Sequence, residues 1–187
     1  PEDVLTVSVF PEHDVFGMQL SYYDGEQTLE AEPYKNGNVS WMRWKVGNQA
    51  AQYYGFRYDE LDRLKNAKYY AKYLEPVLST GGNGQIQWSP VTIHQDRYNV
   101  FGLGYDGAGN ITSLSRNGYV NCQTVKIDEL AYSYGGGVAN QLSGVVEASN
   151  AAHGFKNTAT YSYDNNGNLI SDSGKGIVTI HYNFLNL

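Results

Sequence analysis

Residues 161–169, Tyr161-Ser162-Tyr163-Asp164-Asn165-Asn166-Gly167-Asn168-Leu169, contain the pattern that decides the fold. Tyr161 and Tyr163 alternate with a serine, so a strand places both rings on one face. Asp164 can accept hydrogen bonds from backbone N–H groups two or three residues ahead. Gly167 can adopt the left-handed conformation that closes such a turn, and the leucine at the end starts a return strand. The segment is therefore predicted to form a β-hairpin.

The same pattern recurs along the chain. Two further copies align without gaps, at residues 56–64 and 103–111, and weaker copies lie at residues 20–25, 34–39, 132–137 and 180–183. A degenerate internal repeat indicates a series of hairpins rather than one unrepeated fold. The predicted turn residues are Asp59, Asp62, Asp106, Gly109, Asn110, Asp164, Gly167 and Asn168. The predicted repeat aromatics, which should pack against neighbouring hairpins, are Tyr58, Tyr105, Tyr132, Tyr134, Tyr161, Tyr163 and Tyr182.

Composition supports an all-β chain of antiparallel hairpins that form a curved sheet with little helix. Of 187 residues, 17 are Tyr and 21 are Gly, which favours strands joined by tight turns. We expect one domain over residues 1–187, with a flexible loop at residues 78–85. Residues 59–75 are ambiguous, because apolar residues at near-helical spacing suggest an amphipathic helix. The repeat alignment favours a strand from residue 64 to residue 73.

Charge and cysteine content narrow the function classes. The net charge of −6 disfavours nucleic acid as a partner. Cys122 is the single cysteine, so the chain can form no internal disulfide and no cysteine-based zinc site. The four histidines are far apart and give no metal-binding motif, and no run of residues is apolar enough to span a membrane. We expect no cofactor and no metal.

The ordered Tyr-Asp-x-x-Gly-Asn-Leu copies resemble the YD repeats of the RHS (rearrangement hot spot) family, in the form found in large cell-surface proteins of the Bacteroidetes type. The matching stretches are residues 14–18, 36–44, 54–64, 154–156 and 182–187. The resemblance implies a spiral of hairpins that forms a hollow β-shell around a C-terminal effector, often a toxin. It also implies a cell-surface or secreted location, although Pro1-Glu2-Asp3 lacks the basic start of a signal peptide.

The residues give little support for catalysis. Asp164, Asn166 and Asn168 alternate like the first ligands of a calcium loop, but the position of its bidentate glutamate is occupied by Lys175. No nucleophile motif is present. Carboxylates such as Asp59 and Asp62 could act as a glycosidase pair only if the fold sets the required separation. Turn formation is the simpler role for these aspartates.

The predicted function is a non-enzymatic structural segment, a wall of an RHS-type shell that contacts neighbouring repeats and a C-terminal effector. The alternative is a carbohydrate-binding, lectin-like module that uses exposed tryptophan and tyrosine faces, with Trp41, Trp44 and Trp88 as the candidate glycan-binding residues. Trp41 and Trp44 are three residues apart, so a regular strand turns them to opposite faces. These readings predict different surfaces, with aromatic rings buried between strands in a shell wall and exposed in a lectin.

Overall fold

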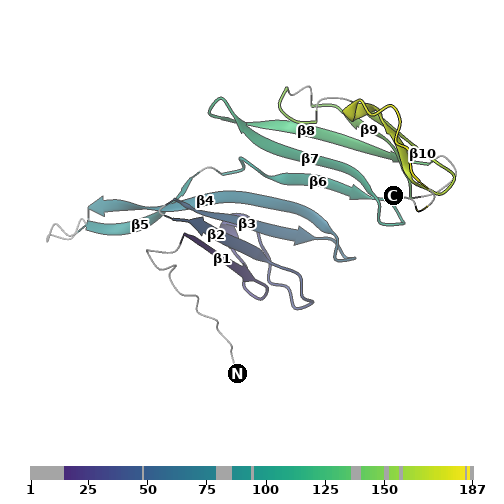
Figure 1. Ribbon diagram of the computed structural model, residues 1–187. Coiled ribbons are helices and arrows are strands. Elements are labelled where there is room, and N and C mark those ends of the chain that lie inside the picture. Colours follow the sequence, from purple (N-terminus) through teal and green to yellow (C-terminus); the bar gives the residue numbers. More distant parts are fainter. Residues whose placement is uncertain are drawn as a thin grey trace. The chain divides into compact units, whose positions relative to one another are not determined.

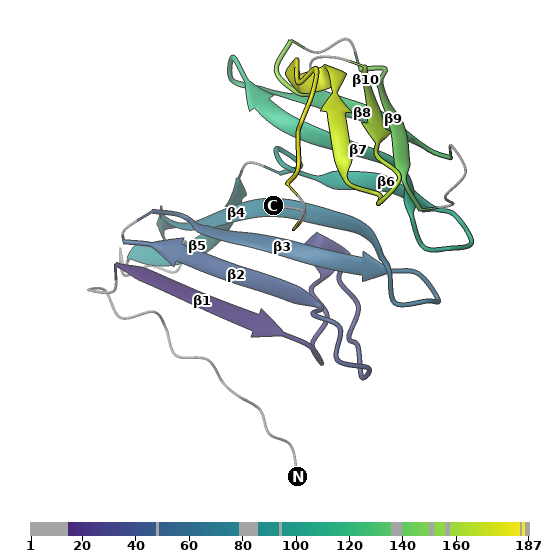
Figure 2. The ribbon, with the colours of Figure 1, turned by 45° about the vertical axis from the view of Figure 1, so that its right-hand side comes forward.

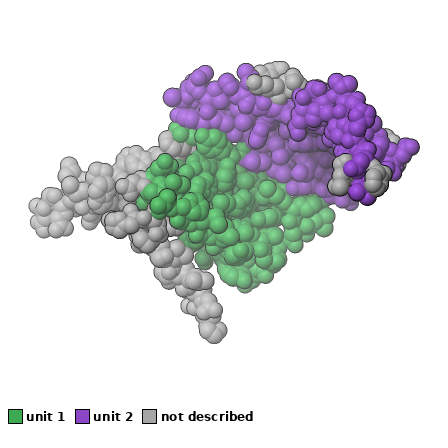
Figure 3. Space-filling view, in the orientation of Figure 1, with its two compact units in different colours: residues 1–99 green, residues 100–187 purple. Residues whose placement is uncertain are grey.

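The structure is a computed structural model that describes residues 15–47, 49–78, 86–93, 95–135, 140–149, 152–155, 158–183 and 185. For residue 28 and for residues 73–78 and 86–93 only the backbone is described. The chain divides into two compact units, residues 1–99 and residues 100–187 (Figure 3). Residues 79–85 of the predicted flexible loop lie outside the described residues.

The described chain is all-β and consists of antiparallel hairpins, as the sequence predicts (Figure 1). Unit 1 contains β1 (Phe16–Ser21), the 3-10 turn η1 (Gln27–Leu29), β2 (Trp41–Val46), β3 (Ala51–Tyr58), β4 (Leu64–Leu78) and β5 (Ile86–Ile93). Unit 2 contains β6 (Val100–Tyr105), β7 (Ile111–Val120), β8 (Gln123–Tyr134), β9 (Leu142–Glu147), β10 (Ala159–Tyr163), β11 (Leu169–Asp172) and the 3-10 turn η2 (Ser173–Lys175). In each unit successive strands pair antiparallel. No described helix is long and apolar enough to cross a membrane.

The ambiguous segment is a strand. Residues 59–63 form a turn, and β4 runs from Leu64 to Leu78 opposite β3, which excludes the alternative helix. The pairing places Tyr53 opposite Tyr70 and Tyr54 opposite Tyr69. The rings of Tyr53 and Tyr70 stack with centroids 4.7 Å apart. Cross-strand aromatic contacts of this kind stabilise a sheet and outweigh a local helical pattern.

One face of the unit 1 sheet is covered by the segment between β1 and β2. Figure 2 shows β1 to β4 side by side. On one face the segment between β1 and β2 places Leu29 and Ala31 against Tyr70, which is fully buried, and Trp41 and Tyr53 pack around this cluster. Lys72 lies over the rings of Tyr53 and Tyr70, 5.7 Å and 4.9 Å from their centroids. This packing is the hydrophobic core of the unit.

Unit 2 contains a buried carboxylate. Asp128 on β8 is fully buried and accepts hydrogen bonds from Arg116 Nε on β7 and from the backbone N–H of Phe155, the latter at 2.5 Å. At Gly154 a Cβ would lie 1.9 Å from the carbonyl oxygen of Ile127. Gly154 therefore permits the close approach of residues 154–155 to β8, and Asp128 binds them there.

Gly55 provides a test of the unit 1 core. A Cβ at this position would lie 2.4 Å from Leu29 Cβ and 3.0 Å from the Leu29 carbonyl oxygen, so the segment carrying Leu29 must shift. We expect Gly55→Ala to lower the free energy of unfolding by about 1–3 kcal/mol in urea denaturation. Gly107→Ala is the matched control, because a Cβ at Gly107 has no atom within 4 Å. Equal stability of the two variants would contradict the close approach.

Candidate functional site

Three five-residue turns have the same hydrogen bonds. The turns are residues 59–63, 106–110 and 164–168, and each begins with an aspartate. In the last turn, Asp164 Oδ1 accepts from the backbone N–H groups of Asn166 and Asn168, both at 2.9 Å, and Asp164 Oδ2 accepts from Asn168 Nδ2 at 2.9 Å. The backbone N–H of Asp164 donates to the Asn168 carbonyl oxygen at 2.9 Å. Asp59 and Asp106 make the equivalent contacts in the other two turns.

The fourth position of each turn is left-handed. Gly109 and Gly167 have φ values of +88° and +86°, and Asp62 occupies the same conformation with φ +60°. Glycine adopts this region without steric cost, and aspartate is among the few other residues that tolerate it. The alignment of Asp62 with the two glycines therefore has a conformational basis.

Each turn aspartate is held in its charged form. The side chain of Arg63 lowers the pKa of Asp59, with its guanidinium 2.7 Å from Asp59 Oδ2. The side-chain amides of Asn110 and Asn168 lower the pKa values of Asp106 and Asp164, and backbone N–H groups add to the effect. A carboxylate that stays ionised near neutral pH is suited to accepting the hydrogen bonds that close a turn and unsuited to donating a proton in catalysis.

Tyrosine hydroxyls connect successive copies of the repeat. Tyr163 Oη donates to the carbonyl oxygen of Leu142, the first residue of β9, at 2.9 Å. Three more pairs follow the same rule, in which the acceptor is an early residue after the preceding turn. These are Tyr58 to Val39 at 3.0 Å, Tyr134 to Ile111 at 2.9 Å and Tyr182 to Leu169 at 3.0 Å. Burial raises the pKa values of Tyr58 and Tyr134, so their hydroxyls keep their protons.

The remaining repeat aromatics also lie on strands. Tyr105 ends β6 opposite Ile111, Tyr132 on β8 lies opposite Val145, and Tyr161 on β10 lies opposite Asp172. All three are partly buried. Burial raises the pKa values of Tyr132 and Tyr161. The sequence identified these tyrosines, like those whose hydroxyl contacts are given above, as packing residues.

Asparagine side chains join neighbouring turns, which the sequence analysis missed. Asn36 Nδ2 and Asn38 Nδ2 both donate to Asp62 Oδ1, at 2.5 Å and 3.0 Å. In unit 2, Asn110 Nδ2 donates to Asn140 Oδ1 at 3.0 Å. Asn36 and Asn38 flank a glycine in one of the weaker copies, but this local pattern does not indicate that Asp62 is their partner.

Trp41 and Trp44 do not share one face of their strand. Trp41 contacts Tyr53 on the core side, whereas Trp44 stacks on Tyr54 with centroids 5.7 Å apart and contacts Tyr69 on the other face. Burial raises the pKa of Tyr54 to about 12. The side chain of Trp88 lies outside the described residues. Trp41 and Trp44 are each partly buried, so neither offers a flat, fully exposed ring.

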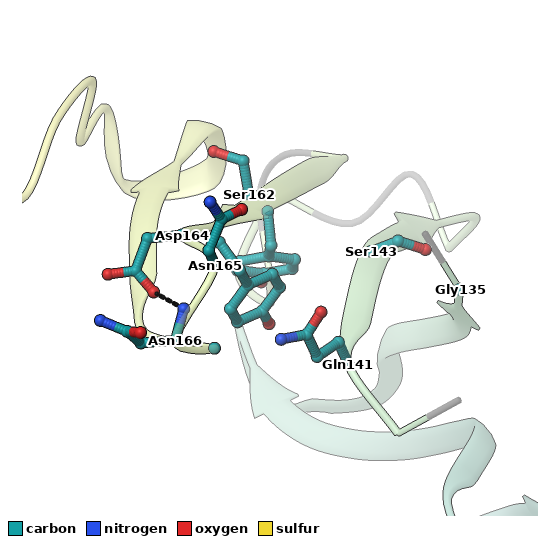
Figure 4. Close-up of a pocket in the computed structure, with 10 residues that line it drawn as sticks. Gly135, Gln141, Ser143, Ser162, Asp164, Asn165 and Asn166 are labelled. Carbon is teal, nitrogen blue, oxygen red and sulfur yellow. Dashed lines mark hydrogen bonds between the residues drawn. The ribbon is translucent and has the colours of Figure 1, made fainter. Parts of the chain in front are cut away.

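A pocket of about 610 Å³ lies beside the turn at Asp164. Figure 4 shows Gln141 and Ser143 on one side of it and Ser162, Asn165 and Asn166 on the other. Its lining residues are Gly135, Gln141, Ser143, Tyr161, Ser162, Tyr163, Asp164, Asn165, Asn166 and Gly167. A smaller pocket of about 260 Å³ in unit 1 is lined in part by Tyr69, Arg97 and Tyr98.

Comparisons with known proteins and a search for metal sites add no further assignment. No protein-family model matches the chain, and no curated protein matches it. Within the part of the chain that the structure describes, no group of three or more His, Cys, Asp or Glu side chains could hold a metal ion. The repeated turns, the tyrosine hydroxyl contacts and the pocket at Asp164 are therefore the features that bear on function.

The tyrosine contacts can be tested by removing a single hydroxyl. Tyr163→Phe keeps the ring and leaves the Leu142 carbonyl oxygen without its donor, so we expect the free energy of unfolding to fall by about 1 kcal/mol. Tyr161→Phe is the control on the same strand, because within the described chain no hydrogen bond of the Tyr161 hydroxyl is found. Urea denaturation measures both. A loss for Tyr161→Phe as large as that for Tyr163→Phe would argue against the contact.

The turn aspartates predict a loss of stability in acid. Their folded pKa values lie below 3.8, so their contribution is complete above the unfolded pKa and is lost as the pH falls through the folded pKa. Thermal unfolding between about pH 6 and pH 2 should therefore show a decline below about pH 4. The double variant Asp106→Asn/Asp164→Asn should be less stable at neutral pH and decline less steeply in acid. An unchanged acid slope in this variant would contradict the assignment.

Proposed function

We propose that the chain is a non-enzymatic architectural segment of the RHS/YD-repeat type, a wall that encloses or presents a C-terminal effector at the bacterial surface. The observation that carries the proposal is the tyrosine contact between copies. Within the described residues, the hydroxyls of Tyr58, Tyr134, Tyr163 and Tyr182 donate to backbone carbonyl groups at or just after the preceding copy. Such contacts make each hairpin a support for the next, as in other repeat architectures in which stability depends on neighbouring units.

The chemistry of the turns supports the same role. All three turn aspartates use both carboxylate oxygens to hold their own turn. A group committed in this way is a poor general acid or nucleophile, because its oxygens are already hydrogen-bonded and its pKa is low. The most regular polar residues of the chain therefore serve structure.

The edge strand β1 of unit 1 also supports a role within a larger assembly. Among the described residues, β1 pairs with β2 alone. Its apolar side chains Phe16, Met18 and Leu20 are 58%, 55% and 42% exposed. An unpaired edge strand with exposed apolar residues is expected to be covered by a further strand or a partner. Neighbouring repeats of a longer chain and an enclosed effector are the partners that the resemblance implies.

Carbohydrate binding through the tryptophans is the less favoured alternative. It requires exposed aromatic faces directed to one side, and Trp41 and Trp44 lie partly buried on opposite faces of β2. Trp41 contacts Tyr53 and Trp44 stacks on Tyr54, and both tyrosines are half-buried residues of the sheet itself.

Hydrogen exchange tests whether the copies support each other. In a wall, Tyr163→Phe should increase amide exchange in β9, which supplies the acceptor, as well as in β10, which carries the tyrosine. The effect should be absent from unit 1. Faster exchange confined to β10 and β11 would mean that the hairpins fold independently, and the architectural proposal would be wrong. Tyr161→Phe, measured in parallel, controls for loss of a hydroxyl from β10 alone.

A further inference from the structure

The pocket beside Asp164 is lined by neutral hydrogen-bonding groups from two directions. Gln141 and Ser143 lie just before and within β9, whereas Asn165 and Asn166 belong to the turn after β10 (Figure 4). Ser162 on β10 completes the polar lining. Amides and hydroxyls both donate and accept, so a ligand that carries hydroxyl groups finds a partner for either role. The side chains of Asn165 and Asn166 are exposed and can reorient toward such a ligand.

The charges around the pocket disfavour anions. No basic side chain is present among its described lining residues. Asp164 lines the pocket, and the hydrogen bonds of its turn lower its pKa, so it is ionised at neutral pH. Both of its oxygens already accept hydrogen bonds within the turn. A phosphate, a sulfated sugar or an acidic peptide would meet a negative charge with no positive charge to offset it.

Two of the residues that line the pocket are aromatic. Tyr161 and Tyr163 line it, and both are partly exposed. No Val, Leu, Ile or Met side chain is among the described lining residues, so the pocket offers no aliphatic recess for a hydrophobic anchor of a peptide. Tyrosine combines a flat apolar face with a polar end, which suits a ligand with both C–H and O–H groups. The volume of about 610 Å³ lies in the range of small-molecule sites.

We propose that this pocket is a binding site for a neutral saccharide, with Gln141, Asn165 and Asn166 as hydrogen-bonding residues and Tyr161 as the surface under the sugar ring. The site differs from a site built on Trp41 and Trp44 in its unit and its residues. It does not depend on the architectural role, because a wall segment and a free-standing module would carry the same pocket.

The test is an NMR titration of the isotope-labelled 187-residue chain. The probes are neutral trisaccharides, namely chitotriose, cellotriose, maltotriose and mannotriose, with a sulfated heparin trisaccharide as the anionic comparison. We expect at least one neutral probe to cause saturable shifts of the side-chain amides of Gln141, Asn165 and Asn166, with a dissociation constant in the millimolar range. Gln141→Ala should weaken this binding about tenfold, which is the effect of losing one good hydrogen bond.

Two further variants test whether the saccharide binds at this pocket. Gln123→Ala removes the same side chain from an exposed position of unit 2 outside the pocket and should bind as the unchanged chain does. Asn165→Ala, at an exposed turn position, should also weaken binding and serves if Gln141→Ala changes the folded spectrum. The proposal is overturned if no neutral trisaccharide causes saturable shifts. It is likewise overturned if the heparin trisaccharide alone binds, or if the shifts map to the residues around Tyr98 in unit 1.

Discussion

The hydrogen bond from a tyrosine hydroxyl to the backbone of the preceding copy is the contact on which the arrangement of hairpins depends. A turn closed by aspartate defines one hairpin and carries no information about the next one. At Asp59 and Asp164 the tyrosine immediately before the aspartate supplies this information, because the hydroxyl of Tyr58 or Tyr163 donates to a backbone carbonyl group that follows the preceding turn. Each of these two repeats therefore contains one residue for its own turn and, beside it, one residue for its neighbour.

Both units contain these turns and tyrosine contacts, and each adds a different stabilising contact. Unit 1 adds a covered sheet face, where Leu29 and Tyr70 are almost fully buried and Gly55 allows the covering segment to approach. Unit 2 has a buried carboxylate, Asp128, which ties residues 154–155 to β8. A hairpin series with few buried apolar side chains needs such additional contacts, since two-stranded hairpins are only marginally stable alone.

The sequence was sufficient for features set by local chemistry. Asp164 and Gly167 indicated the turn by their spacing, and Asp62 could be aligned with the glycines because aspartate tolerates the same conformation. The opposite orientation of Trp41 and Trp44 followed from strand alternation, which holds because β2 pairs with both neighbours without a bulge. The all-β class could also be predicted from composition and repeats, because strand and turn preferences are local properties of the residues.

Features that depend on distant contacts were beyond the sequence. Asn36 and Asp62 are 26 residues apart, and nothing in either copy shows that their side chains meet. The helical spacing in residues 59–75 was misleading because stacking between β3 and β4 decides that segment. The pocket at Asp164 combines a turn with residues about 20 positions earlier, so its polar lining is visible only once the strands are paired.

The geometry of the turns separates positions that must be retained from positions that are free to vary. The internal hydrogen bonds use the side chains of the aspartate and of the last residue together with backbone groups, whereas the second and third side chains make none of them. These free positions are Glu60-Leu61, Gly107-Ala108 and Asn165-Asn166 in the three turns. The same backbone thus displays an acidic and an aliphatic side chain, almost no side chain, or two amides. Such a surface can diversify in evolution while the scaffold beneath it stays the same.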